Sequence, residues 1–189
     1  MKMPLILNVS AVSMIFAGSS VLASAQTVKV DAQQTQLMLA ASSADTAHQE
    51  LEKAGALGFR PVMATTRGNG ELVVLLQRDL KATEQVQLHL IATTATKTFE
   101  KEIEESAAQG YRAVPQTFLN KPTGFIGNEI VVIMERPVNP SKKYEYKLVS
   151  TNQTSTLKSE WGDAASLGYK ALAFLTRAEV MLLMEREKR

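Results

Sequence analysis

The chain of 189 residues has no cysteine, which excludes disulfide-stapled folds, thiolate metal sites, a cysteine nucleophile and a cysteine-anchored lipoprotein. With only two histidines, the chain has too few histidines for a conventional His-rich metal site and few candidates for a catalytic triad. The 21 Lys and Arg residues nearly balance the 19 Asp and Glu residues, and a net charge of +2 does not favour nucleic-acid binding, which needs a basic patch. With 45% hydrophobic and 21% charged residues, the composition is that of an ordinary globular protein.

Residues 1–25 have the three regions of a secretory signal peptide. Lys2 supplies the positive start, an apolar stretch runs from Pro4 to about Ala17, and Ala23-Ser24-Ala25 matches the A-x-A cleavage pattern. The apolar stretch is interrupted by polar residues and is shorter than the roughly 20 residues that a membrane span needs. We therefore expect cleavage after Ala25, export to the periplasm or the extracellular space, and no membrane span in the mature chain.

Three segments of the remaining chain follow one sequence plan, which indicates internal duplication. Each opens with an alternating strand, continues with a Gly-aromatic-basic triplet, and closes with an apolar strand that ends in arginine. The opening strands match at residues 36–39, 87–90 and 145–148, the triplets begin at Gly58, Gly110 and Gly168, and the closing arginines are Arg78, Arg136 and Arg186. We predict a signal peptide over 1–25 and three repeats over 26–80, 81–138 and 139–189.

Each repeat is predicted to fold as strand, helix, strand, strand, with the second strands at residues 62–66, 113–118 and 171–176. The opening strands alternate polar and apolar residues, and apolar residues four and three apart follow at helical spacing. Glycine avoids a Cβ clash in the left-handed conformation that commonly ends a helix. We therefore predict a positive φ at Gly58, Gly110 and Gly168, with the next aromatic residue packed on the last helical turn.

The closing strands at residues 72–76, 130–134 and 180–184 are apolar without alternation, which is typical of strands buried on both faces. One helix covers only one face of a sheet, so the other face must meet another repeat or another chain. We predict the α+β class, with three tandem β-α-β-β repeats, mainly antiparallel sheet, one helix per repeat, and a compact pseudo-threefold body. Trp161 takes the helix position of Leu51 and Ile103, and we expect it in the core.

The third repeat combines Lys143-Tyr144-Glu145-Tyr146-Lys147-Leu148-Val149, Leu167-Gly168-Tyr169-Lys170-Ala171-Leu172 and Leu182-Leu183-Met184-Glu185-Arg186. In these motifs it resembles a short bacterial family, the domain of unknown function 4177. The second repeat resembles that family moderately, and the first departs most, with Gln36-Leu37 in place of aromatic residues. The resemblance implies a small α+β fold and no catalytic residue.

The second repeat departs from the other two by an inserted hairpin segment over residues 119–128. Apolar side chains in and beside a Pro- and Gly-shaped loop favour a contact with a partner or ligand. The candidate partner-binding residues are Phe118, Leu119, Asn120, Lys121, Phe125 and Ile126. The alternative is that these side chains fold back to cover a sheet edge.

Hydroxyl residues gather before the predicted helices, where free backbone N–H groups bind anions or sugar hydroxyls. The candidate ligand-binding residues are Thr94, Thr96, Thr154 and Ser155. The alternative is ordinary helix capping. We expect His48 and His89 to be surface or capping residues, and the charged residues after the closing strands to return the chain to water. No metal or cofactor is predicted.

The leading hypothesis is an exported, non-enzymatic module that binds an unknown protein or envelope component, with oligomers formed through sheet edges where sheets remain open. One alternative is a small-molecule or sugar-binding protein, or a hydrolase, that uses a cleft between repeats. The glutamates of residues 100–105 would be its candidate acids, although they also fit a solvated helix face. A structural assembly subunit is the other alternative.

Overall fold

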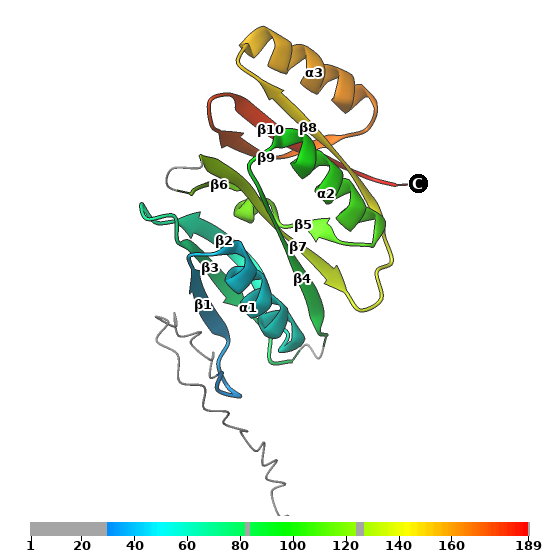
Figure 1. Cartoon of the computed structure of the whole chain (residues 1–189). Helices are drawn as coiled ribbons and strands as arrows, with labels where there is room; N and C mark the ends of the chain where they lie inside the picture. Colours follow the sequence, from blue (N-terminus) through cyan, green and yellow to red (C-terminus); the bar gives the residue numbers. More distant parts are fainter. Residues whose placement is uncertain (1–29, 82–83, 124–126, 189) are drawn as a thin grey trace, which may run out of the picture.

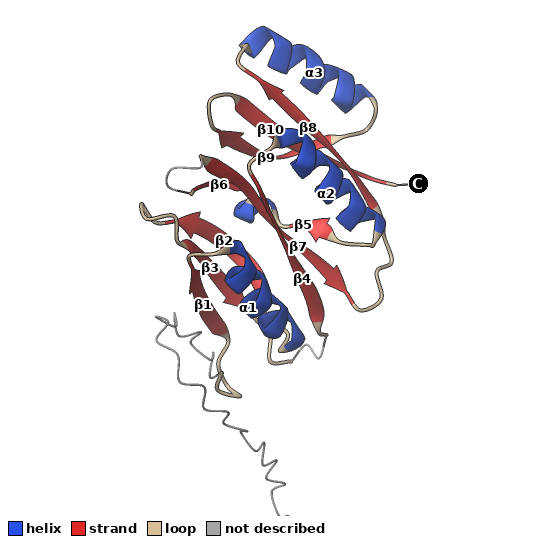
Figure 2. Ribbon diagram, viewed as in Figure 1, coloured by secondary structure: helices blue, strands red, loops and turns tan. Residues whose placement is uncertain are grey.

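The computed structural model describes residues 30–81, 84–123 and 127–188, so the predicted signal peptide lies outside the described residues. The chain is α+β, and the described residues form three antiparallel sheets and three α-helices (Figures 1 and 2). Unit 1 contains β1 (Gln36–Ala41), α1 (Ala44–Ala56), β2 (Arg60–Thr66) and β3 (Leu72–Gln77). Unit 3 contains β8 (Tyr144–Thr151), α3 (Thr154–Ser166), β9 (Lys170–Thr176) and β10 (Val180–Glu187).

Unit 2 follows the same order with one interruption. It contains β4 (Val86–Thr93), α2 (Thr96–Ala108), β5 (Arg112–Ala113), a 3-10 helix (Pro115–Thr117), β6 (Leu119–Pro122) and β7 (Asn128–Pro137). The sequence predicts one strand over residues 113–118, and this is wrong. Pro115 has no backbone N–H for the ladder, so hydrogen bonding to β7 ends with the Val114 amide, which donates to the Ile133 carbonyl, and strand pairing resumes at Leu119.

The three sheets share one topology, in which the last strand of each unit is central. The strand orders are β1-β3-β2, β4-β7-β5 and β8-β10-β9, with β6 also paired to β7. Met38, Leu90 and Leu148 lie at the same distance along the chain from the helix that follows, and they pair with Leu75, Ile133 and Leu183. These pairs define equivalent positions in the three units.

The units lie in a row, so the prediction of a pseudo-threefold body is wrong (Figure 1). One core joins the helix side of sheet 1 to sheet 2, a second joins the helix side of sheet 2 to sheet 3, and a third lies between sheet 3 and α3. Helix α1 contacts both β1 and β4, and α2 contacts both β4 and β8, whereas α3 contacts β8 of its own unit. Each junction therefore joins the helix side of one unit to the opposite side of the next, which leaves two ends rather than a closed ring.

The predicted glycine caps are confirmed. Gly58, Gly110 and Gly168 have φ angles of 82°, 92° and 88°. In α1, the amides of Gly58 and Phe59 donate to the carbonyl oxygens of Gly55 and Ala54, and α2 and α3 end in the same pattern. This double bond is the Schellman motif, which satisfies carbonyls that a helix end leaves without partners.

The closing strands agree with the prediction in two units. In β7, residues 130–134 are fully buried, and so are residues 181–184 of β10. In β3, only Leu72, Val74 and Leu76 are buried, whereas Val73 and Leu75 on the other face are partly exposed. Double burial therefore holds where the unit's own helix covers one face and a preceding unit covers the other, and it fails for sheet 1, which has no preceding unit among the described residues.

Candidate functional site

Each unit carries an arginine clamp, formed by an arginine at the end of its last strand: Arg136 and Arg186 lie within β7 and β10, and Arg78 directly follows β3. The guanidinium carbon lies over the aromatic ring of the Gly-aromatic-basic triplet, at 4.6 Å for Arg78 over Phe59, 4.7 Å for Arg136 over Tyr111 and 4.5 Å for Arg186 over Tyr169. The same guanidinium donates to the carbonyl oxygen of the residue that caps the helix: Leu57, Gln109 and Leu167. The clamps thus combine cation–π stacking with closure of the helix end, beyond the predicted return to water.

The basic residue of the triplet reaches across to the next unit. Arg60 of unit 1 lies 3.6 Å from Glu135 of unit 2, and Arg112 of unit 2 lies 2.9 Å from Glu185 of unit 3. Glu135 and Glu185 are equivalent residues, since each directly precedes a clamp arginine. The third basic residue, Lys170, forms no ion pair with any described residue.

A buried tyrosine completes the second of these junctions. The Tyr146 hydroxyl donates to Glu185 at 2.8 Å and accepts from the backbone N–H of Ala113 at 2.8 Å. Burial raises the pKa of Tyr146 far above its ordinary value, so the hydroxyl keeps its proton. Unit 3 is therefore attached to unit 2 by a satisfied polar network beside the apolar core.

A charged cleft of about 1050 Å³ opens beside this network, at the end of unit 3. Its three carboxylates are all paired: Glu185 with Arg112, Glu187 with Lys142, and Glu145 with Arg186 and Lys188. Hydrogen bonds from Arg186 and Lys188 hold the pKa of Glu145 below its usual value. Each carboxylate of the cleft is therefore already engaged by a cationic side chain of this chain.

The structure brings the two histidines together at the first junction, although they come from different units. The rings of His48 and His89 are edge to face at 5.2 Å, and Tyr111 lies 5.7 Å from His89. His48 Nδ1 accepts the backbone N–H of Leu90 at 3.2 Å, so the ring covers part of the edge strand β4. Desolvation and the nearby His48 lower the pKa of His89. Among the described residues, no group of three or more potential ligands is placed to hold a metal ion.

The inserted segment lies against both neighbouring units. Phe118 is buried, with its ring 5.7 Å from that of Phe99, and Lys121 is buried and lies 3.0 Å from Glu129. Leu119 is half-buried against the first core, and Asn120 has a buried Oδ1 without a hydrogen-bond partner. Phe125 and Ile126 lie outside the described residues. Residues 118–121 therefore make internal contacts, in line with the alternative that they cover an edge.

The predicted ligand-binding hydroxyls lie at two different helix starts. Thr94 and Thr96 precede and begin α2, while Thr154 and Ser155 begin α3, and none of them lines the charged cleft. The Thr94 carbonyl accepts from Arg177 at 3.3 Å. Side-chain capping is present at α1, where Ser43 accepts from the amide of Thr46, and is absent at α2 and α3. Their role in ligand binding stays a prediction.

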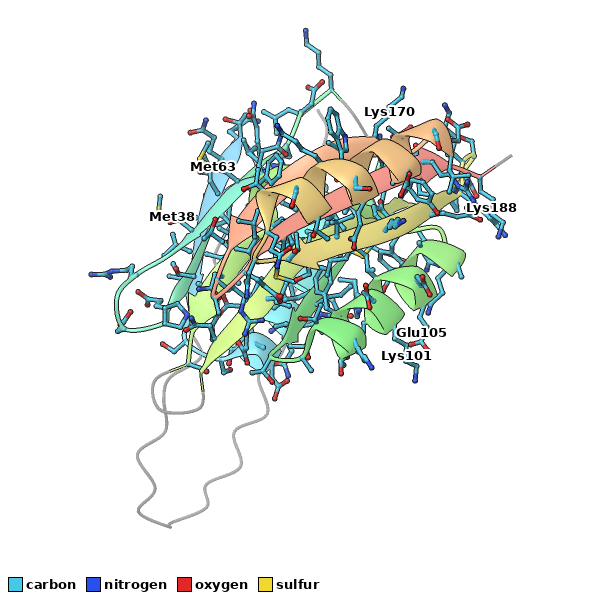
Figure 3. The ribbon with its side chains drawn as sticks, turned by 90° about the horizontal axis from the view of Figure 1, so that it is seen from above. Met38, Met63, Lys101, Glu105, Lys170 and Lys188 are labelled. Atoms are coloured by element: carbon cyan, nitrogen blue, oxygen red, sulfur yellow. The ribbon has the colours of Figure 1, made fainter. Side chains whose placement is uncertain are left out.

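Sheet 1 presents apolar side chains to solvent on the side away from α1. We define this open face by Met38, Ala40, Met63, Val73 and Leu75. Met38 and Met63 both pair with Leu75, so the three form one row across the sheet, and Figure 3 places the two methionines on the same side of the molecule. Met38 is 68% exposed and Met63 is 53% exposed. In contrast, the equivalents of Met38, which are Leu90 and Leu148, are each 8% exposed because the preceding unit covers them.

The other end of the row, on unit 3, also exposes large apolar side chains. We define the outer face of unit 3 by Trp161 on α3 and Phe174 on β9. Trp161 is 48% exposed, whereas Leu51 and Ile103 at the same helix position are 0% and 2% exposed. The expectation of a core tryptophan is therefore wrong, because no further unit lies over α3 in the part of the chain that the structure describes. Phe174 is 63% exposed.

The two cross-unit ion pairs were missed at the sequence level, although both halves recur there. A basic residue ends every triplet, and Gln77, Glu135 or Glu185 precedes every clamp arginine. The signal in the sequence is that the basic residue of the triplet and the residue before the clamp arginine recur together in every repeat.

Comparisons with protein-family models, with curated proteins and with solved structures found no match to this chain. Within the part of the chain that the structure describes, no helix is both long and apolar enough to cross a membrane.

Proposed function

We propose that the protein is an exported, non-enzymatic interaction module, and that it binds a protein partner through the open face of sheet 1. The observation that carries the proposal is the 68% exposure of the Met38 side chain. The equivalent Leu90 and Leu148 are buried, because each packs against the preceding unit of the same chain. An apolar patch of this kind on a soluble chain is typical of an interaction site.

The composition of the open face supports a protein partner. It holds two flexible methionines beside the aliphatic Val73 and Leu75, and methionine adapts to partners of differing shape. No charged residue lies within the row formed by Met38, Leu75 and Met63. Burial of such a surface is favourable by about 25 cal/mol per Å² of apolar area.

The arrangement of charges supports a non-enzymatic role. The carboxylates of the charged cleft are held by Arg and Lys partners. Glu100 and Glu102 on α2 have raised pKa values, through partial burial first and then through the neighbouring Glu104 and Glu105. The four glutamates lie on one helix, and repulsion between like charges along a helix explains why Glu104 and Glu105 raise these pKa values. A catalytic role is not needed to explain them.

We infer further that the units arose by duplication, as the recurrence of one sequence plan in three segments indicates. Three helix ends with the same glycine cap, three arginine clamps and two equivalent cross-unit ion pairs support this inference. Duplication accounts for the apolar side chains of the open face, because the equivalent faces of sheets 2 and 3 are packed against the preceding unit.

The experiment compares the exported chain with the double variant Met38→Lys/Met63→Lys as baits in a pull-down from envelope extract. Val138→Lys is the matched control, since Val138 is 64% exposed but lies outside the open face, in the segment after β7. We expect the wild type and the control to retain the same proteins, and the double variant to lose them. Equal recovery by all three baits would contradict the proposal.

A further inference from the structure

We propose that the partner is a second copy of this chain, joined head to tail, with the outer face of unit 3 packed on the open face of sheet 1 in the next copy. This inference rests on the proposed function above and names the occupant of the open face.

The chain contains the proposed interface twice already. At each internal junction, the helix and the helix side of the sheet of one unit pack on the sheet face of the next unit that lies away from that unit's own helix. We call the first of these surfaces the giving side and the second the receiving side. Unit 3 has a giving side with nothing on it, and unit 1 has a receiving side with nothing on it, among the described residues. The two free ends are thus the two halves of one kind of contact.

Side-chain exposure shows where each half is missing its counterpart. On the giving side, exposure goes from 0% at Leu51 and 2% at Ile103 to 48% at Trp161. On the receiving side, exposure is 8% at Leu90 and at Leu148 but 68% at Met38. Docking unit 3 on the next copy would bury Trp161 and Met38 as their equivalents are buried within the chain.

Edge strands follow the same rule. Strand β4 is an edge strand covered by α1, through contacts that include the hydrogen bond from the Leu90 amide to His48, and β8 is an edge strand contacted by α2. Strand β1 is the equivalent edge of sheet 1, and no helix of a preceding unit lies over it in the described part of the chain. Helix α3 of a second copy would cover that edge, which otherwise invites uncontrolled strand pairing.

Polar groups at the two ends match as well. Arg60 reaches Glu135 and Arg112 reaches Glu185 across the internal junctions. The equivalent groups at the free ends are Lys170 on unit 3 and Gln77 on unit 1, both exposed. In the proposed contact Lys170 donates to the amide oxygen of Gln77, a weaker interaction than the internal ion pairs and one suited to a reversible assembly.

The described residues that lead into β1 lie away from the open face. Val30 packs against the core on the helix side of sheet 1. The clamp arginine Arg78 holds the same segment through the carbonyl oxygens of Asp31, Ala32 and Gln34. Residues 30–34 therefore lie on the covered side of the sheet.

Such a contact is heterologous, so it joins copies into open chains rather than closed pairs. Sedimentation equilibrium over a wide concentration range tests this with Met38→Lys, Trp161→Glu and the control Val138→Lys. We expect the wild type and the control to grow beyond the dimer with concentration. Each end variant alone should dissociate at least about tenfold more readily, as for loss of a central apolar anchor. An equimolar mixture of the two end variants should form a dimer that does not extend, since each supplies one intact end.

Introduced cysteines give a second measurement that does not depend on stability, because the chain has no native cysteine. The double variant Gln77→Cys/Lys170→Cys should form disulfide-linked ladders between copies, and each single variant should stay uncrosslinked. Efficient crosslinking of Gln77→Cys alone would indicate a face-to-face pair and would overturn the inference. A wild type that stays monomeric at every concentration would also overturn it. The function proposed above would survive that result if other envelope proteins are still lost from the Met38→Lys/Met63→Lys bait.

Discussion

Arg112 of unit 2 and Glu185 of unit 3 form a forked ion pair across the junction between the two units. Three N–O contacts of 2.9, 3.1 and 3.2 Å join them. The Glu185 side chain is buried, whereas that of Arg112 is half exposed and lies over the Tyr144 ring at 4.6 Å. A forked, charge-assisted pair fixes the direction as well as the distance between its partners. The pair therefore sets how unit 3 sits on unit 2.

Replacement of Arg112 by Ala should destabilise the chain by about 1–3 kcal/mol, because Glu185 keeps its charge but loses its main partner. The cost falls below that of a fully buried pair because water reaches Arg112. Urea unfolding at neutral pH measures the change. The matched control is Lys142→Ala, which breaks the exposed pair with Glu187 and should leave stability unchanged. Equal effects of the two replacements would contradict this role for Arg112.

Replacement of Tyr146 by Phe should cost about 1–3 kcal/mol, because the Ala113 amide loses its acceptor and Glu185 loses a donor while both stay buried. Thermal unfolding followed by circular dichroism gives the difference. Tyr144→Phe serves as the control on the same strand, since its hydroxyl makes no hydrogen bond with a described residue. A Tyr146→Phe chain as stable as the control would show that the network contributes nothing.

Apart from the strand break at Pro115 in unit 2, the local structure of the units could be predicted from the sequence, because short-range rules decide it. A helix that ends in Gly58-Phe59 has one favourable geometry, and the φ of 82° follows from the absence of a Cβ. Alternation in β8 places Tyr146 and Leu148 on one face of their strand for a similarly local reason, whereas their burial on that face is supplied by unit 2. Such features depend on neighbours in the chain and not on other units.

The arrangement of the units could not be predicted in this way. The sequence motifs align Leu37 with Leu88, but the structure makes Met38 the equivalent of Leu90, with Leu88 matched to Gln36. A shift of one residue moves a side chain to the other face of its sheet. The motif alignment therefore gives no sign that Met38 is exposed. The sequence predicts Trp161 in the core because it has the helix position of Leu51 and Ile103, but those two residues are buried with the help of the following unit.

Glycine replacements separate backbone strain from crowding. Gly168→Ala should cost about 1–2 kcal/mol from the left-handed conformation alone, since its Cβ would meet nothing. Gly110→Ala should cost more, because its Cβ would also lie 2.9 Å from Pro140 Cγ. Gly162→Ala, inside α3 with open space around it, should stabilise the chain by up to about 1 kcal/mol. Chemical denaturation of the three variants gives the order, and a Gly162→Ala chain less stable than wild type would contradict it.

The junction between units 1 and 2 should weaken in mild acid through His89. Burial and the nearby His48 lower the pKa of His89 below its ordinary value of 6.5, while Glu52 acts weakly in the opposite direction. The unfolded chain therefore binds more protons than the folded chain between the lowered pKa and pH 6.5. Stability from this source is fully present above pH 6.5 and is lost as the pH falls through 6.5 to the folded pKa. Urea unfolding between pH 5 and pH 8 should show a steeper fall for wild type than for His89→Gln, because the carboxylates common to both chains cancel in the comparison. Parallel curves for the two chains would show that His89 does not carry the effect.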